Sequence, residues 1–283
     1  MQPIFSAQVA RQRLPVWIGL AGVCALAWAY TVWHAVLLPM DGGSGMAASA
    51  GMGGSAGMAG MAGSVAGMAM AMPRQASWDA VALTLTFAMW AVMMVAMMVP
   101  AAAPMILLFA TVHRRQREGG HAAVPTAVFL AGYLAVWSAF SALATSAQWG
   151  LHEAALLSPM LAATRPWLGG GLLIAAGVYQ WTPLKQACLA KCRSPLGFLL
   201  TEWREGVRGA LVMGVRHGGY CTGCCWALMA LLFVGGVMNL VWVAALAVVV
   251  LGEKVLPRGA LLGKAGGLGL IGWGAWVVAR GLS

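Results

Sequence analysis

Charged residues are scarce in this sequence, and their scarcity excludes an ordinary soluble domain. Only 8% of the 283 residues are charged, whereas 61% are hydrophobic and the mean hydropathy is +0.82. A typical globular domain has roughly 25% charged residues. The composition therefore predicts a membrane protein.

Acidic residues are the scarcest charged group, with 7 Asp and Glu in the whole chain. They are scattered, so they supply no pair of catalytic carboxylates. We find neither a hydrolase triad nor a phosphate-binding loop. Hydrolytic and nucleotide chemistry therefore have little support. The sequence does not decide whether the protein is an enzyme, but it favours a binding protein.

The basic residues are also few, and they lie in short loops between apolar segments. They number 17 and give a formal charge of +10. Basic loops of polytopic membrane proteins face the cytoplasm, so this excess reads as loop charge and not as a nucleic-acid footprint. The six cysteines are an even number, but outside a small secreted domain that says little about disulfides.

Long apolar segments follow one another along most of the chain. About 20 apolar residues suffice to cross a bilayer as a helix. We therefore predict an all-α, polytopic transmembrane bundle of about seven helices in a bacterial-type inner (cytoplasmic) membrane. The predicted helices are about 16–38, 78–112, 124–149, 166–183, 206–234, 239–255 and 261–278.

The composition divides the chain into three parts. Residues 1–38 form an N-terminal transmembrane helix, and residues 78–283 form a helical membrane domain with the cysteine motifs. Between them, residues 39–77 are rich in Gly, Ala, Ser and Met, which predicts a flexible extracytoplasmic loop. This segment is either a plain linker or a tether whose thioethers collect Cu(I). It has no histidine, which makes Cu(II) capture less attractive.

Three cysteines and a histidine lie within nine residues of an otherwise apolar run. Cys221 and Cys224 have C-x-x-C spacing, Cys225 follows at once, and His217 precedes Cys221 by four residues. Residues three and four apart share a helix face, so these side chains would form one ligand stripe. A buried cysteine can also be a simple packing residue. Three in five residues favour metal or redox chemistry.

Further sulfur atoms flank this motif. Cys188 and Cys192 are four residues apart in a basic segment, where nearby lysines would lower a thiol pKa. Met229 continues the stripe beyond Cys225. Methionines also recur every four residues between 89 and 98, as packing residues or as a metal ladder.

Read in order, these motifs resemble the DUF2182 family of predicted metal-binding integral membrane proteins, some of which are labelled copper chaperones. The resemblance runs from about Trp78 to Pro257 and implies a membrane topology and metal handling. It rests on Met89-Trp90, Ala96-Met97-Met98-x-Pro100, Cys188-x-x-x-Cys192-Arg193-x-Pro195, Trp203-x-x-Gly206, His217-x-x-x-Cys221-x-x-Cys224-Cys225-Trp226-x-x-Met229, Met238-Asn239 and Glu253-Lys254.

Our main hypothesis is a protein that binds and transfers a soft metal ion, with Cu(I) preferred and zinc as the alternative. The expected ligands are Cys221, Cys224, Cys225, His217, Met229, Cys188 and Cys192. Its expected partners are the lipid bilayer, the metal ion and a copper donor or acceptor protein, without nucleic acid. Two other hypotheses remain: a membrane thiol-disulfide oxidoreductase, and a structural or assembly subunit of a larger membrane complex.

Overall fold

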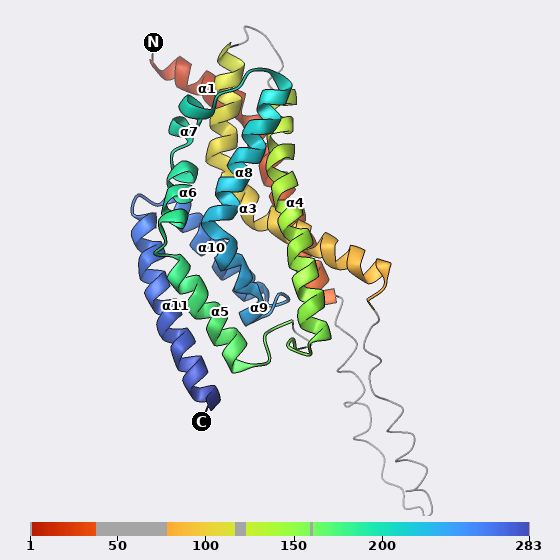
Figure 1. The fold of residues 1–283 in the computed structure, drawn as a ribbon. Helices are drawn as coiled ribbons and strands as arrows, with labels where there is room; N and C mark the ends of the chain where they lie inside the picture. Colours follow the sequence, from red (N-terminus) through yellow and green to blue (C-terminus); the bar gives the residue numbers. More distant parts are fainter. Residues whose placement is uncertain (1, 38–77, 117–122, 159–160, 283) are drawn as a thin grey trace, which may run out of the picture.

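The chain folds into a bundle of helices, as the apolar segments predict (Figure 1). The structure is a computed structural model and describes residues 2–37, 78–116, 123–158 and 161–282. Within these ranges the only β pairing is an isolated bridge between Leu157 and Ala163. The helices are α1 (Gln2–Leu37), α3 (Ala80–Gln116), α4 (Ala123–Glu153), α5 (Pro166–Tyr179), α6 (Pro183–Arg193), α7 (Pro195–Glu202), α8 (Gly206–Ala230), α9 (Leu232–Gly235), α10 (Leu240–Val255) and α11 (Gly259–Leu282).

The predicted all-α membrane bundle is confirmed, and each of the seven predicted helices has a counterpart. In the described part of the chain, five helices are long and apolar enough to cross a membrane: α1, α3, α4, α8 and α11. The helices α5 and α10 have 14 and 16 residues, fewer than the roughly 20 that a full crossing needs. The predicted loop at 39–77 lies outside the described residues, and the three-part division of the chain stays a prediction.

The segment predicted as a basic loop after α5 is helical instead. Thr182 begins α6 because its side chain accepts a hydrogen bond from the backbone N–H of Lys185. Pro183 and Pro195 occupy the first turns of α6 and α7, where a missing N–H costs nothing. The segment is therefore helical in spite of its low hydropathy, because Thr182 and the two prolines favour the start of a helix.

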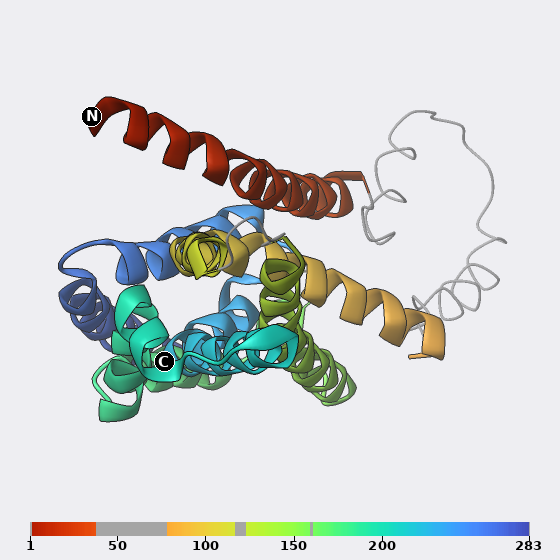
Figure 2. The same cartoon turned by 90° about the horizontal axis from the view of Figure 1, so that it is seen from above.

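The helices are arranged around α3, α4 and α8, which run along the bundle (Figure 1). The helix α4 packs along α8, while α5 packs along α11 on one flank. Figure 2 shows α1 beside α3 at the opposite edge, away from α5 and α11. Only 11% of the residues in the apolar part of α1, Val16–Trp33, are buried, so this helix is peripheral.

Small residues let α4 and α8 approach closely. A Cβ atom at Gly214 would clash with the carbonyl oxygen of Phe129, and one at Gly132 would lie 2.5 Å from that of Leu211. Membrane helices use such small residues to bring their backbones together. The contact fixes the position of α8, which carries the cysteine motif.

The helix α3 is bent (Figures 1 and 2), and it contains Pro100 and Pro104. A proline inside a helix removes a hydrogen bond and favours a kink. Its six methionines are all buried, and none of them is more than 8% exposed. They are Met89, Met93, Met94, Met97, Met98 and Met105.

A buried ion pair joins α6 to α10. Lys185 Nζ lies 2.6 Å from Glu253 Oε2, and both side chains are at most 2% exposed. Lys185 also donates a hydrogen bond to Gln180 Oε1, and Arg193 donates to the backbone carbonyl of Glu253. Since buried charges are tolerated only when they are paired, this network fixes α6 beside the end of α10.

The close approach of α4 and α8 predicts different effects for two glycines of one helix. We expect Gly214→Ala to lower the free energy of unfolding by about 1–3 kcal/mol, because its methyl group meets backbone. The control Gly219→Ala has open space and should be neutral or stabilising by up to about 1 kcal/mol. Denaturant unfolding in detergent measures both. Equal effects at the two positions would contradict the packing described.

The buried ion pair predicts a second pair of outcomes. Glu253→Gln leaves the Lys185 ammonium group buried without a carboxylate, which should cost about 3–5 kcal/mol of stability. The double variant Lys185→Met/Glu253→Met removes both charges and should recover most of that loss in the same unfolding assay. At the partly exposed pair of Arg216 and Glu202, Glu202→Gln should cost less than about 1 kcal/mol. A double variant as unstable as Glu253→Gln would refute this account.

Candidate metal centre

The predicted ligand stripe lies on one continuous helix in the interior of the bundle. Residues 206–230 are helical throughout, so the glycines beside the cysteines do not unwind α8. Cys221, Cys224 and Cys225 are each 1% exposed, and His217 is 2% exposed. The spacing of three and four residues therefore puts all four side chains on the buried face, as the sequence predicts.

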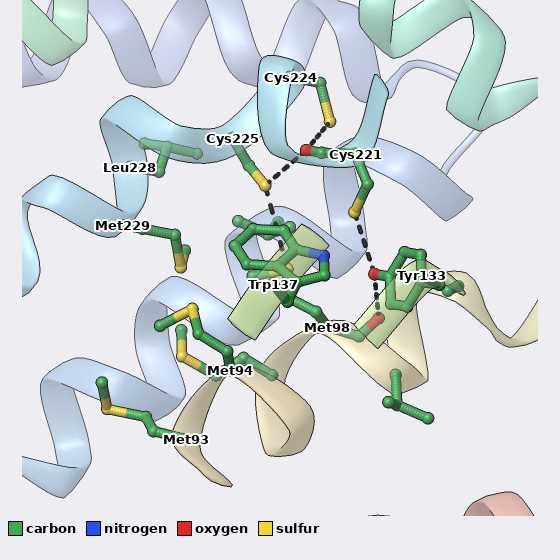
Figure 3. Packing of buried hydrophobic residues seen from close by; sticks show 14 of the residues in the cluster. Met93, Met94, Met98, Tyr133, Trp137, Cys221, Cys224, Cys225, Leu228 and Met229 are labelled. Carbon is green, nitrogen blue, oxygen red and sulfur yellow. Dashed lines mark hydrogen bonds between the residues drawn. The ribbon is translucent and has the colours of Figure 1, made fainter. Parts of the chain in front are cut away.

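Cys221 contacts two polar groups from other helices. Lys254 Nζ on α10 donates a hydrogen bond to Cys221 Sγ at 2.8 Å. The hydroxyl of Tyr133 on α4 lies 3.1 Å from the same sulfur, and it donates a hydrogen bond to the carbonyl of Met98 (Figure 3). Cys221 thus lies where α3, α4 and α10 meet α8.

The other two thiols contact sulfur atoms of neighbouring helices. Cys224 Sγ lies 3.9 Å from Cys192 Sγ on α6, and Cys225 Sγ lies 3.9 Å from Met98 Sδ on α3. Both thiols also contact the carbonyl of Cys221, at 3.1 and 2.9 Å. Figure 3 shows the Cys224 and Cys225 thiols on two sides of the Cys221 carbonyl oxygen that both of them contact.

The sulfur atoms are therefore arranged in pairs between helices. Among the described residues, no three His, Cys, Asp or Glu side chains come together closely enough to hold a metal ion. Metal–thiolate bonds in zinc sites are about 2.3 Å long, so two sulfurs on one ion lie about 3.8 Å apart at a tetrahedral angle and about 4.6 Å apart at most. Both pairs, at 3.9 Å, lie within this range.

The two cysteines of α6 have different neighbours. A Cβ atom on Gly223 would lie 2.8 Å from Cys188 Sγ, so Cys188 packs against the backbone of α8. Cys192 instead lies beside the cysteines of α8. The 188/192 pair therefore faces the motif on α8, and glycine at 223 makes room for it.

The prediction that nearby lysines lower these thiol pKa values is wrong. Burial raises the pKa of Cys188, and the neighbouring Cys224 raises it further. Hydrogen bonding to Cys221 and Cys224, together with burial, raises the pKa of Cys192 well above its usual value. The ammonium groups of the flanking lysines have other partners than these thiols. Lys185 pairs with Glu253, and Lys191 contacts the Thr201 hydroxyl at 3.5 Å.

His217 and Met229 lie at the two ends of the stripe. The His217 ring lies among the rings of Phe129, Tyr133 and Phe198, with centroids 5.3–6.1 Å away, and its Nδ1 has no hydrogen-bond partner. Met229 is fully buried. Figure 3 shows it on the side of Cys225 away from Cys224, toward Met94.

One interpretation of charged residues is corrected by the structure. The Glu253-Lys254 pair alone would predict an interfacial anchor, but these residues are 1% and 8% exposed and bind Lys185 and Cys221. Arg216, on the same helix as the cysteines, has a side chain that is 45% exposed and pairs with Glu202. An adjacent Glu-Lys pair does not reveal which neighbour each side chain faces.

Sequence reasoning missed two residues that contact the cysteines, Lys254 and Tyr133, whereas Met98 belongs to the methionine series that the sequence singles out. Lys254 stands in a motif that carries the family resemblance, and this signal could have found it. Tyr133 lies in an apolar helix and has no local motif around it. Its role follows only from the packing of α4 on α8.

A cavity of about 190 Å³ adjoins the sulfur pair of α6 and α8. Its wall includes Cys192, Lys254, Arg193 and Met105, together with Pro104 and Pro195. Its lining residues come from the middle of α3, from the junction between α6 and α7 in the basic segment, and from the end of α10. The cavity therefore gives a small ligand access to the wall that contains Cys192.

The comparisons with known proteins identify a family. The family model PpoB2, described as a copper chaperone, matches residues 87–277, about two thirds of the chain. No curated protein and no solved structure shows significant similarity to the chain. The match covers the methionines of α3 and the cysteines of α6 and α8, and it agrees with the resemblance seen in the sequence. The chain therefore belongs to the PpoB2 family of copper chaperones.

Proposed function

We propose that this protein binds Cu(I) between sulfur atoms of α3, α6 and α8 and passes the ion from one sulfur pair to the next. The observation that carries the proposal is that α8 contributes one thiol to each of two sulfur contacts. Cys224 meets Cys192, and Cys225 meets Met98, both at 3.9 Å. Membership of a copper chaperone family supports copper as the metal.

The chemistry of the pairs favours Cu(I) over harder ions. Thiolate and thioether sulfurs are soft ligands that select Cu(I), whereas carboxylate and carbonyl oxygens suit Mg²⁺ or Ca²⁺. A zinc site of Cys and His would need four converging ligands, and the described residues show no group of even three. Pairs of sulfur atoms suit an ion that changes ligands one at a time.

The two pairs suggest a direction along which copper moves. The buried methionines of α3 lead from the outer end of that helix to Met98 and Cys225. Cys224 and Cys192 then lead to the cavity near the basic segment. Basic loops face the cytoplasm in helical membrane proteins, so we place this cavity on the cytoplasmic side of a bacterial inner membrane.

Cys221, Cys188, His217 and Met229 complete the proposed site. Cys221 lies one helical turn before Cys224 and Cys225, whose thiols contact its carbonyl oxygen. Cys188 and Met229 extend the sulfur surface at its two ends, and the free Nδ1 of His217 is an available donor beside it. Soluble copper donor or acceptor proteins would supply or remove the ion at the membrane surfaces.

A redox function has one observation in its favour. The contact between Cys192 and Cys224 joins the two cysteine motifs, as a thiol-disulfide relay would require. The same contact serves metal binding, and the described cysteines are all free thiols. The alternative therefore stays open to experiment.

Copper content tests the proposal. The protein is purified with Cu(I) under reducing conditions, and copper per chain is measured by elemental analysis. We expect the wild type to retain copper, because each sulfur pair has the spacing for one ion. The variant with Cys221, Cys224 and Cys225 changed to Ser should fall to the level of a protein-free detergent blank. The control Cys24→Ser changes a cysteine of α1 and should retain the wild-type content.

Two outcomes would contradict copper binding at these residues. One is equal copper in the wild type and the triple variant. The other is a copper-free wild type in which alkylation under reducing and oxidising conditions reveals an interconverting disulfide between Cys192 and Cys224. That second result would support the thiol-disulfide relay instead.

A further inference from the structure

Lys254 is a buried cation that directly contacts the proposed copper site. Its Nζ lies 2.8 Å from Cys221 Sγ, and the residue is only 8% exposed. Among the described residues no carboxylate pairs with it, because the adjacent Glu253 pairs with Lys185. Lys254 also forms part of the wall of the cavity beside Cys192. The buried charge of this lysine therefore acts on the electrostatics of the site, in addition to the packing of its side chain.

The net charge of the site depends on how many thiols bind the ion. Metal-bound thiols lose their protons, so each contributes a charge of −1. No three of the described His, Cys, Asp and Glu side chains lie close enough to hold one ion, and Cys192 and Cys224 are in contact as a pair. We therefore take an ion beside Lys254 to be held by two of the three thiols of Cys192, Cys221 and Cys224. Two thiolates and the ammonium group of Lys254 together carry a net charge of −1.

A monovalent ion brings this sum to zero, whereas a divalent ion brings it to +1. A net charge is costly inside an apolar bundle, where the interaction between charges is screened far less than in water. Without the lysine the preference between the two ions reverses. Two thiolates with a divalent ion then have a net charge of zero, whereas two thiolates with a monovalent ion have a net charge of −1. The pair formed by Cys225 and Met98 has one thiolate and one neutral thioether, so it is already neutral with a monovalent ion.

We infer that Lys254 is a specificity-determining residue, whose positive charge restricts the thiolate site of α6 and α8 to monovalent soft ions such as Cu(I). This inference rests on the proposed function and adds to it the physical basis of the choice between copper and zinc. Lys254 holds no metal ion itself; it sets the charge that the ion must have. Glu253 and Lys185 neutralise each other and leave this charge unopposed.

Binding of two probe ions tests the inference. Ag(I) is a monovalent soft ion that is not oxidised in air, and Cd(II) is a divalent ion that also prefers thiolates. Both affinities are measured by competition with a chelator for the purified full-length protein in detergent. We expect Lys254→Met to lower the ratio of Ag(I) to Cd(II) affinity by about tenfold or more, since a unit charge at this distance is strongly felt in the interior.

Two further variants separate charge from structure. Lys254→Arg keeps the charge and should retain a ratio close to that of the wild type. Lys264→Met removes a lysine that lies over the Trp181 ring, 5.6 Å from its centroid, and should leave the ratio unchanged. If Lys254→Met does not purify as a folded protein, Lys254→Gln removes the same charge and takes its place.

An unchanged ratio in Lys254→Met or Lys254→Gln would overturn the inference, as would an equal shift in Lys264→Met. A change of both affinities by the same factor would show that Lys254 only supports the fold, and it too would overturn the inference. The two proposals fail in different ways. A wild-type protein without cysteine-dependent Ag(I) binding refutes the proposed function, whereas intact binding with an unaltered ratio refutes only the role of Lys254.

Discussion

Charged side chains buried in an apolar bundle must find their partners within it, and this constraint organises the end of the molecule that contains the cysteines. Glu253 and Lys254 are adjacent on α10, yet they face different helices. Glu253 pairs with Lys185 of α6, and Lys254 binds Cys221 of α8. Because an unpaired buried charge is costly, these two contacts together fix α6, α8 and α10 relative to one another. Cys192 and Cys224 face each other as a consequence.

Close packing also fixes the position of α8, on the sides where it meets α4 and α3. Glycines allow α8 to lie against the backbone of α4, and Met98 of α3 packs against Cys225 of α8. Sulfur-containing side chains fill the interior that results. Methionine is flexible and polarisable, so it can pack a core and can also serve as a weak ligand for a soft ion. The arrangement couples the packing of the bundle to its proposed chemistry.

The sequence predicts the fold well because long apolar segments and basic loops have few interpretations in a membrane protein. It also predicts that Cys221, Cys224 and Cys225 share the buried face of a helix, since that follows from spacing within one element. It does not predict that Cys192 meets Cys224, because contacts between helices depend on packing. The basic segment folds into α6 and α7, where capping by Thr182 and two prolines outweighs polarity. Lys254 resembles an interfacial lysine until the position of α10 is known.

The central claim is that sulfur atoms provide most of the ligands of the metal ion. X-ray absorption at the copper edge of the copper-loaded, full-length protein tests this claim most directly, because it reports the oxidation state and the nearest ligand atoms together. The account predicts Cu(I) with a first shell of sulfur at about 2.3 Å or slightly less, by analogy with metal–thiolate bonds in proteins. Copper in the Cu(II) state, or a first shell dominated by nitrogen or oxygen, would contradict it.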